Sequence, residues 1–118
     1  ILQGKEMKKR TFLFIDDFCN AIIRVNKKGK DNEIYNIGSN FEYKNIEIVK
    51  LITKKMGVAF DKYVSFTNDR PFNDFRYSIN FKKIMKLGWE PKVRVEDQIE
   101  NIIDWYNQNI KRYPKRFS

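Results

Sequence analysis

The chain has 118 residues, a mass of 14.3 kDa, and 42% hydrophobic, 15% aromatic and 33% charged residues, which fits one globular domain and excludes a disordered polyelectrolyte. The net charge of +9 invites an anionic partner. However, residues 5–10 carry +3 and residues 111–118 carry +4, so only +2 remains across residues 11–110. Solvated chain ends account for most of the excess, and we expect no nucleic-acid partner.

The content of cysteine and histidine excludes several kinds of site. A lone Cys19 and the absence of histidine exclude an internal disulfide, a zinc site built from Cys and His, and any catalytic triad that uses His. No apolar run approaches the roughly 20 residues that a membrane-spanning helix needs, and no signal-peptide pattern opens the chain. We therefore expect a cytoplasmic protein with no metal and no membrane partner.

The first elements are a strand and a helix. A compact apolar run, TFLFI, predicts a buried strand over residues 11–15. A helix is expected to follow as far as residue 28, with Asp16 or Asp17 as its N-cap and Gly29 as its stop. Its apolar positions recur at helical spacing, at Phe18, Ala21, Ile22 and Val25.

A second strand and a second helix come next. The sequence EIYNI predicts a strand over residues 33–37, after a turn at residues 28–32. Asn45 has the spacing of an N-cap for an amphipathic helix over residues 46–56, which Gly57 ends. The same asparagine is also a candidate side-chain donor to a bound ligand.

Residues 58–78 show no regular spacing of apolar residues, apart from a short strand expected over residues 63–66. Long ordered loops in small domains are more often binding segments than spacers, so this loop is the first functional candidate. Beyond it, Asn80 is expected to cap a short helix that Gly88 ends, and another helix is expected to start near Val95. The order of elements indicates a mixed α/β fold with surplus helix. Three large aromatic residues are interpreted as core, namely Trp89, Trp105 and Tyr106.

Three arginines lie beside strand-like or turn residues, at Arg10, Arg70 and Arg76. A guanidinium presents a rigid fork of donors that matches phosphate oxygens, so these side chains are candidates for a diphosphate clamp. The alternative is that Arg70 and Arg76 pair with Asp69 and Asp74 inside the loop. The five glycines are too far apart for a dinucleotide or phosphate loop, and no tyrosine precedes a lysine by four positions.

Five segments occur in the order that is typical of one enzyme family. They are residues 10–17 (RTFLFIDD), 35–38 (YNIG), 69–77 (DRPFNDFRY), 87–91 (LGWEP) and 104–106 (DWY). Together they resemble the C-terminal part of the nucleotide-sugar 4,6-dehydratases, which are members of the extended short-chain dehydrogenase/reductase family. Because the chain starts at Ile1 rather than Met, we expect it to be a fragment.

The resemblance implies a nucleotide-sugar-binding site. The family's arginine of the first motif, its asparagine after Y-N-I-G and its R-P arginine hold the nucleotide diphosphate, and they correspond to Arg10, Asn45 and Arg70. Residues 1–3 match a strand that contacts the nucleotide base. The full set of expected substrate-binding residues is Arg10, Asn45, Arg70, Asn73, Arg76 and Gln3.

The resemblance also implies the fold and the reaction. Residues 1–118 would be the α/β, helix-rich C-terminal substrate-binding portion of a Rossmann-type enzyme that uses dTDP-glucose or UDP-glucose, as in rhamnose biosynthesis. NAD would be bound by the N-terminal half, which also carries the family's catalytic Tyr-Lys and Asp-Glu pairs. We therefore expect no catalytic residue here, and the complete enzyme is expected to be a homodimer.

Two alternatives remain at this point. One is an NDP-sugar epimerase or decarboxylase of the same superfamily, although the form of residues 69–77 favours a dehydratase. The other is a basic nucleic-acid-binding module, to which the charge of +9 would point.

Overall fold

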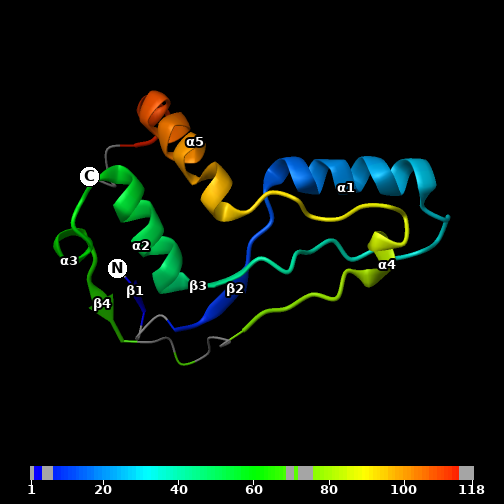
Figure 1. Cartoon of the computed structure of the whole chain (residues 1–118), viewed down its shortest axis with the longest axis horizontal. Helices are drawn as coiled ribbons and strands as arrows, with labels where there is room; N and C mark the ends of the chain where they lie inside the picture. Colours follow the sequence, from blue (N-terminus) through cyan, green and yellow to red (C-terminus); the bar gives the residue numbers. More distant parts are fainter. Residues whose placement is uncertain (1, 4–6, 69–70, 72–75, 115–118) are drawn as a thin grey trace.

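The computed structural model describes residues 2–3, 7–68, 71 and 76–114. The helices and strands, in chain order, are β1 (Leu2–Gln3), β2 (Lys9–Thr11), α1 (Ile15–Lys28), β3 (Glu42–Lys44), α2 (Asn45–Met56), α3 (Phe60–Tyr63), β4 (Phe66–Thr67), α4 (Lys82–Met85), α5 (Val95–Gln108) and η1 (Ile110–Arg112). Figure 1 shows α2, α3 and α5 toward one end of the molecule and α1 with α4 toward the other, with strands β2 and β3 between them.

The described strands form two short sheets. In one, β1 runs parallel to β4, with Gln3 opposite Thr67. In the other, β2 runs antiparallel to β3, and we call this pair the β2–β3 ribbon. Its opposed pairs are Lys9 with Lys44, Arg10 with Tyr43, and Thr11 with Glu42. An isolated parallel bridge adds Arg76 beside Lys9.

A small core joins α1 to α4. Ala21 of α1 and Ile84 of α4 are fully buried, and Trp89 packs with them. The rings of Phe81 and Trp89 pack in a T-shaped arrangement, with the centroids 6.3 Å apart and an interplanar angle of 78°. The interpretation of Trp89 as a core residue is confirmed. This core fixes the position of α1 and of the chain that leads into it.

Asp17 is not the N-cap of α1. The helix begins at Ile15, and Asp17 lies in its first turn, where it is buried. Its Oδ2 accepts hydrogen bonds from the backbone N–H groups of Lys92 and Val93, both at 2.9 Å. The prediction of an aspartate cap is therefore wrong, because this carboxylate is used to hold a distant loop rather than its own helix terminus.

The strand expected over residues 11–15 is also wrong in its extent. Strand β2 ends at Thr11, and Ile15 already begins α1. Between them Phe12, Leu13 and Phe14 are half-buried. They line a cavity of about 230 Å³ shared with α2 and α5, so the apolar run serves packing against helices rather than strand pairing.

The strand expected over residues 33–37 is not formed. This segment is extended, but none of the described strands pairs with it, and the Ile34 side chain is 80% exposed. A short apolar run becomes a strand only where a neighbouring backbone supplies hydrogen bonds, and the described part of the chain does not place one there. The expected strand over residues 63–66 is displaced to β4, because residues 60–63 form α3.

The helix predictions hold better. Helix α2 is confirmed to within one residue, α1 ends at Lys28 as expected but starts earlier, and α5 starts at Val95 as expected. The N-cap position of α4 is Phe81 rather than Asn80, although Asn80 Oδ1 accepts the backbone N–H of Lys82 at 3.0 Å. Gly57 and Gly88 adopt φ of 69° and 90° just after α2 and α4, where only glycine fits without strain. Asn45 is the first residue of α2 and Lys44 holds the N-cap position, so the cap prediction is wrong by one residue.

The chain is open for its length. Its radius of gyration is 17.3 Å, whereas a compact domain of this size has about 13–14 Å. Trp105 and Tyr106, expected in the core, are 44% and 48% exposed and pack edge to face on each other at 5.3 Å. Helix α1 exposes an apolar stripe at Ile15, Phe18 and Ile22. None of the described helices has the length and apolar composition that a bilayer-spanning segment requires.

Candidate functional site

The β2–β3 ribbon sorts its side chains onto two faces. Residues opposite each other in an antiparallel pair share a face, and the faces alternate along each strand. Arg10 and Tyr43 therefore lie on one face, whereas Lys9 and Glu42 lie on the other. The ribbon carries four charged residues on the second face, namely Lys9, Glu42, Lys44 and, through the bridge to Lys9, Arg76.

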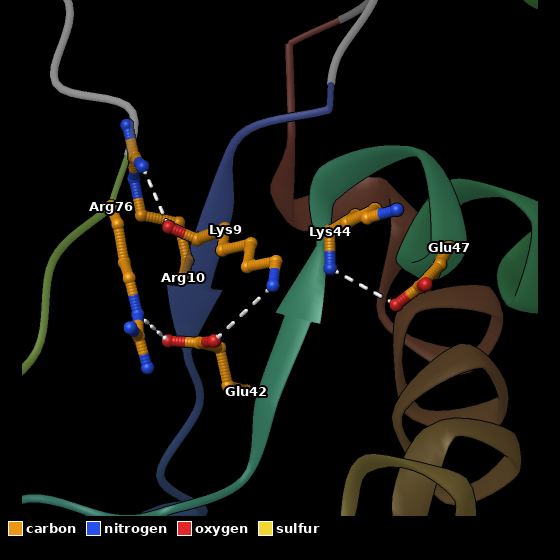
Figure 2. Close-up of polar contacts among 6 residues, drawn as sticks. All are labelled: Lys9, Arg10, Glu42, Lys44, Glu47 and Arg76. Carbon is orange, nitrogen blue, oxygen red and sulfur yellow. Dashed lines mark hydrogen bonds and ion pairs between the residues drawn. The ribbon is translucent and has the colours of Figure 1, made fainter.

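Arg10 is held by contacts on two sides. Its Nη1 donates to the backbone carbonyl of Lys9 at 2.8 Å, as Figure 2 shows. Its guanidinium carbon lies 4.6 Å from the centroid of the Tyr77 ring. Since the side chain is also half-buried, it presents an oriented cation rather than a mobile one.

Arg76 is engaged by Glu42. Its Nε donates to Oε2 of Glu42 at 2.6 Å, and Lys9 Nζ lies 4.0 Å from the other carboxylate oxygen. In Figure 2 the Arg10 and Arg76 side chains extend in opposite directions from the ribbon. The structure thus gives Arg76 an acidic partner on β3. Asp69 and Asp74, the partners weighed from the sequence, lie outside the described residues.

Asn45 stands where the ribbon becomes a helix. Its backbone N–H donates to the Lys8 carbonyl at 2.9 Å, which extends the ladder by one more bond. Within the first turn of α2, Glu47 Oε2 accepts the backbone N–H of Lys44 at 3.0 Å. Because β3 runs directly into α2, the positive end of the α2 dipole lies at the Lys9–Lys44 end of the ribbon, one residue pair away from Arg10. Arginine side chains and helix N-termini each favour an anion.

The remaining expected site residues are placed less completely. Arg70 and Asn73 lie outside the described residues, so their role stays a prediction. Gln3 belongs to β1, which pairs with β4 and not with the β2–β3 ribbon. The structure therefore brings Arg10, Asn45 and Arg76 to one ribbon and leaves Gln3 on a separate sheet.

A tyrosine and a carboxylate connect the ribbon to α5. The Tyr43 hydroxyl donates to Glu96 Oε2 at 2.5 Å. Burial, followed by the hydrogen bond to Glu96, raises the pKa of Tyr43 above 10.0. The hydrogen bond from Tyr43 lowers the pKa of Glu96 below 4.5, with help from the Arg94 charge. This contact fixes the strand opposite Arg10.

The described residues lack the features of a metal site and of a dinucleotide cradle. They contain no cluster of three or more metal-ligating side chains of the Cys, His, Asp and Glu types. The glycines with positive φ, Gly57 and Gly88, follow helices, whereas a dinucleotide cradle needs glycines between a strand and the start of a helix. The described part of the chain therefore does not fit NAD.

Two residues of the site were missed from the sequence. Tyr77 and Glu42 contact Arg10 and Arg76, respectively, yet neither stood out by spacing. The bridge between Lys9 and Arg76 brings Tyr77 next to Arg10 across more than 60 positions of sequence. No local pattern carries that information.

Comparison with known proteins supplies the family context. Residues 1–102 match the sequence model of the family described as GDP-mannose 4,6 dehydratase. The chain is 38% identical over 117 residues to human dTDP-D-glucose 4,6-dehydratase, a match that covers 95% of this chain and 33% of the human protein. It thus spans about a third of the length of the curated relatives it matches.

Solved structures give the same picture. A dTDP-glucose 4,6-dehydratase from Bacillus anthracis, crystallised with NAD, superposes with a TM-score of 0.84 at 34% identity, over 95% of this chain and 35% of that one. A UDP-glucose 4-epimerase from Thermotoga maritima, crystallised with UDP-glucose, has a TM-score of 0.81 at 24% identity, over 92% of this chain and 35% of that one. The second likeness concerns the fold alone.

Proposed function

Because the chain belongs to the nucleotide-sugar 4,6-dehydratases of the extended short-chain dehydrogenase/reductase family, we propose that it is the nucleotide-sugar-binding, C-terminal part of an NDP-glucose 4,6-dehydratase. The fold is the helix-rich portion of a Rossmann-type enzyme, with short strands. The proposed substrate is dTDP-glucose or UDP-glucose.

The observation that carries the proposal is the placement of Arg10. Its guanidinium is oriented by the Lys9 carbonyl and the Tyr77 ring, on the ribbon face that does not carry the Lys9–Glu42–Arg76 cluster. A charge-assisted hydrogen bond from a guanidinium to a phosphate oxygen contributes about 1.5–3 kcal/mol. We assign Arg10 to the diphosphate of the substrate.

Asn45 is assigned to the same ligand. As the first residue of α2 it combines an amide side chain with the positive end of a 12-residue helix. The expected contributions of Arg70 and Asn73, from the loop over residues 58–78, stay predictions. A ligand role of Arg76 also stays a prediction, and it would require this guanidinium to share or leave Glu42.

NAD and the catalytic groups are proposed to lie in a further part of the enzyme. When bound there, NAD would oxidise the sugar at C4 and return the hydride to C6 after water is lost across C5 and C6. This chain would bind and orient the diphosphate, which positions the sugar for that chemistry. We nominate no catalytic residue here, and the 118-residue chain alone is expected to be inactive.

The exposed apolar surface supports a further part. The stripe formed by Ile15, Phe18 and Ile22 is exposed among the described residues, and so is Ile34 in the extended segment over residues 33–37. Since the chain spans about a third of its relatives, we propose that their dinucleotide-binding part covers both. By resemblance, we also propose a cytoplasmic homodimer that acts in deoxysugar synthesis, with rhamnose as one product.

Product formation tests this function. The longer protein that contains this chain is incubated with NAD and either dTDP-glucose or UDP-glucose, and the nucleotide sugar is analysed by mass spectrometry. We expect loss of one water with formation of a 4-keto sugar, and no change with the 118-residue chain alone. Epimerisation without loss of water would instead identify a 4-epimerase, and an unreacted substrate would refute the assignment.

A further inference from the structure

Tyr77 contacts the cation that the proposed function assigns to the diphosphate. The Arg10 guanidinium carbon lies 4.6 Å from the centroid of the Tyr77 ring, well within the roughly 6 Å range of a cation–π interaction. Tyr77 lies outside the named strands and helices, and its side chain is 53% exposed. The ring therefore covers Arg10 from the solvent side rather than filling a core.

The backbone explains why these two residues meet. A parallel bridge joins Lys9 to Arg76, so the next residue on each segment, Arg10 and Tyr77, lies side by side. The ion pair between Arg76 and Glu42 ties the same segment to β3. The cluster of Lys9, Glu42 and Arg76 on one face thus fixes the stacking on the other face.

Stacking is geometrically compatible with phosphate binding. A ring engages the flat face of a guanidinium, whereas phosphate oxygens are bound by the N–H groups at its edge. The Lys9 carbonyl already accepts one of these N–H groups, which limits the rotation of the Arg10 guanidinium. A guanidinium held in one plane loses less conformational entropy when it binds a diphosphate.

We propose that Tyr77 is a positioning residue that holds the Arg10 guanidinium in the orientation that binds the diphosphate of a nucleotide sugar. This rests on the proposed function, since it needs Arg10 to bind the ligand. The aromatic ring is the active feature, and the hydroxyl is not required. Tyr77 acts through Arg10 and need not touch the substrate.

A double-mutant cycle tests the proposal in the longer protein that contains this chain. The variants are Tyr77→Leu, Tyr77→Phe, Arg10→Ala and the double variant with Tyr77→Leu and Arg10→Ala. Affinities for UDP and dTDP are measured by titration calorimetry, after thermal unfolding has verified that each variant is folded. Tyr63→Leu is the matched control, because Tyr63 is also an exposed tyrosine, with the Lys62 ammonium 5.6 Å from its ring centroid.

We expect Tyr77→Leu to weaken nucleoside-diphosphate binding by about 3- to 30-fold, the range that a cation–π contact allows. Tyr77→Phe should restore it to within about twofold of wild type, and Tyr63→Leu should leave it unchanged. In the Arg10→Ala background, Tyr77→Leu should have no further effect.

The outcomes separate this inference from the function it rests on. If wild type binds and Arg10→Ala weakens binding but Tyr77→Leu does not, the positioning role is wrong and the function stands. Equal losses from Tyr77→Leu in both backgrounds would also overturn it, since the effect would not pass through Arg10. If wild type binds neither nucleotide, both the function and this inference fail.

Discussion

The indole N–H of Trp89 donates to the backbone carbonyl of Asp17 at 3.0 Å, and the two residues are 72 positions apart. The side chain of Asp17 continues the connection, because its Oδ2 accepts the N–H groups of Lys92 and Val93. One buried aspartate thus fastens the loop before α5 to the first turn of α1.

Asp17→Ala is expected to destabilise the fold by about 1–3 kcal/mol, because it leaves two part-buried backbone donors without their acceptor. Chemical denaturation of the longer protein measures this. Asp16→Ala is the matched control, since Asp16 lies in the same helical turn but is exposed. It should cost no more than about 1 kcal/mol, the scale of a charge–dipole interaction. Equal losses for the two variants would contradict the role of Asp17.

Ile84→Ala should cost about 2–5 kcal/mol, because Ile84 is completely buried between α1 and Trp89. Thermal and chemical unfolding of the 118-residue chain provide the measurement. Ile34→Ala makes the same chemical change at a side chain that is 80% exposed, and it should change the stability of this chain by less than about 0.5 kcal/mol. A loss at position 34 as large as that at position 84 would show that the core is misassigned.

The two kinds of element differ in how far the sequence determined them. Helices α1, α2 and α5 follow from local spacing and from glycine stops, because a helix satisfies its own hydrogen bonds. Strands need a partner. The sequence EIYNI remains unpaired in the described residues, while EYK, which has no strand pattern, becomes β3 because β2 lies beside it.

The site was predictable only in part, because some of its contacts join residues that are far apart in the sequence. Arg10 and Asn45 were named from the family resemblance, and the structure places both at the β2–β3 ribbon. Asp17, Glu42 and Tyr77 act through partners at least 33 positions away, so no local pattern indicated these contacts. Trp105 and Tyr106 were expected in the core but are exposed. Helical spacing shows which residues share a face of a helix, but it does not show whether another element covers that face.

The hydrogen bond between Tyr43 and Glu96 should make stability depend on pH. The lowered pKa of Glu96 contributes stability above about pH 4.5 that is lost as the pH falls through the folded value. The raised pKa of Tyr43 contributes stability below about pH 10 that is lost as the pH rises through its folded value. Tyr43→Phe should therefore cost about 0.5–1 kcal/mol at neutral pH and less at either extreme. Denaturation at acid, neutral and alkaline pH measures this, and a cost that does not vary with pH would contradict it.

The apolar stripe of α1 should behave differently in the short chain and in the longer protein. Ile22→Gln removes an apolar side chain from the stripe. In the 118-residue chain this substitution should reduce binding of a hydrophobic dye. In the longer protein it should remove a buried apolar contact worth about 1–3 kcal/mol and so lower the melting temperature by a few degrees. Lys27→Gln, also exposed on α1, is the control and should do neither. If Ile22→Gln leaves the longer protein unchanged, the stripe is not covered there.

The proposed role of Arg10 is to bind the diphosphate of a nucleotide sugar, and calorimetric titration of the longer protein with UDP and with dTDP measures that binding. Arg10→Ala should weaken the tighter of the two ligands by about 10- to 150-fold, as expected for the loss of a charge-assisted hydrogen bond of about 1.5–3 kcal/mol. Arg112→Ala is the control, because Arg112 of η1 is another arginine that lies over an aromatic ring. Its guanidinium carbon is 5.8 Å from the centroid of the Trp105 ring. That variant should bind as wild type does. An Arg10→Ala protein that is folded and binds both nucleotides with unchanged affinity would show that Arg10 does not bind the diphosphate.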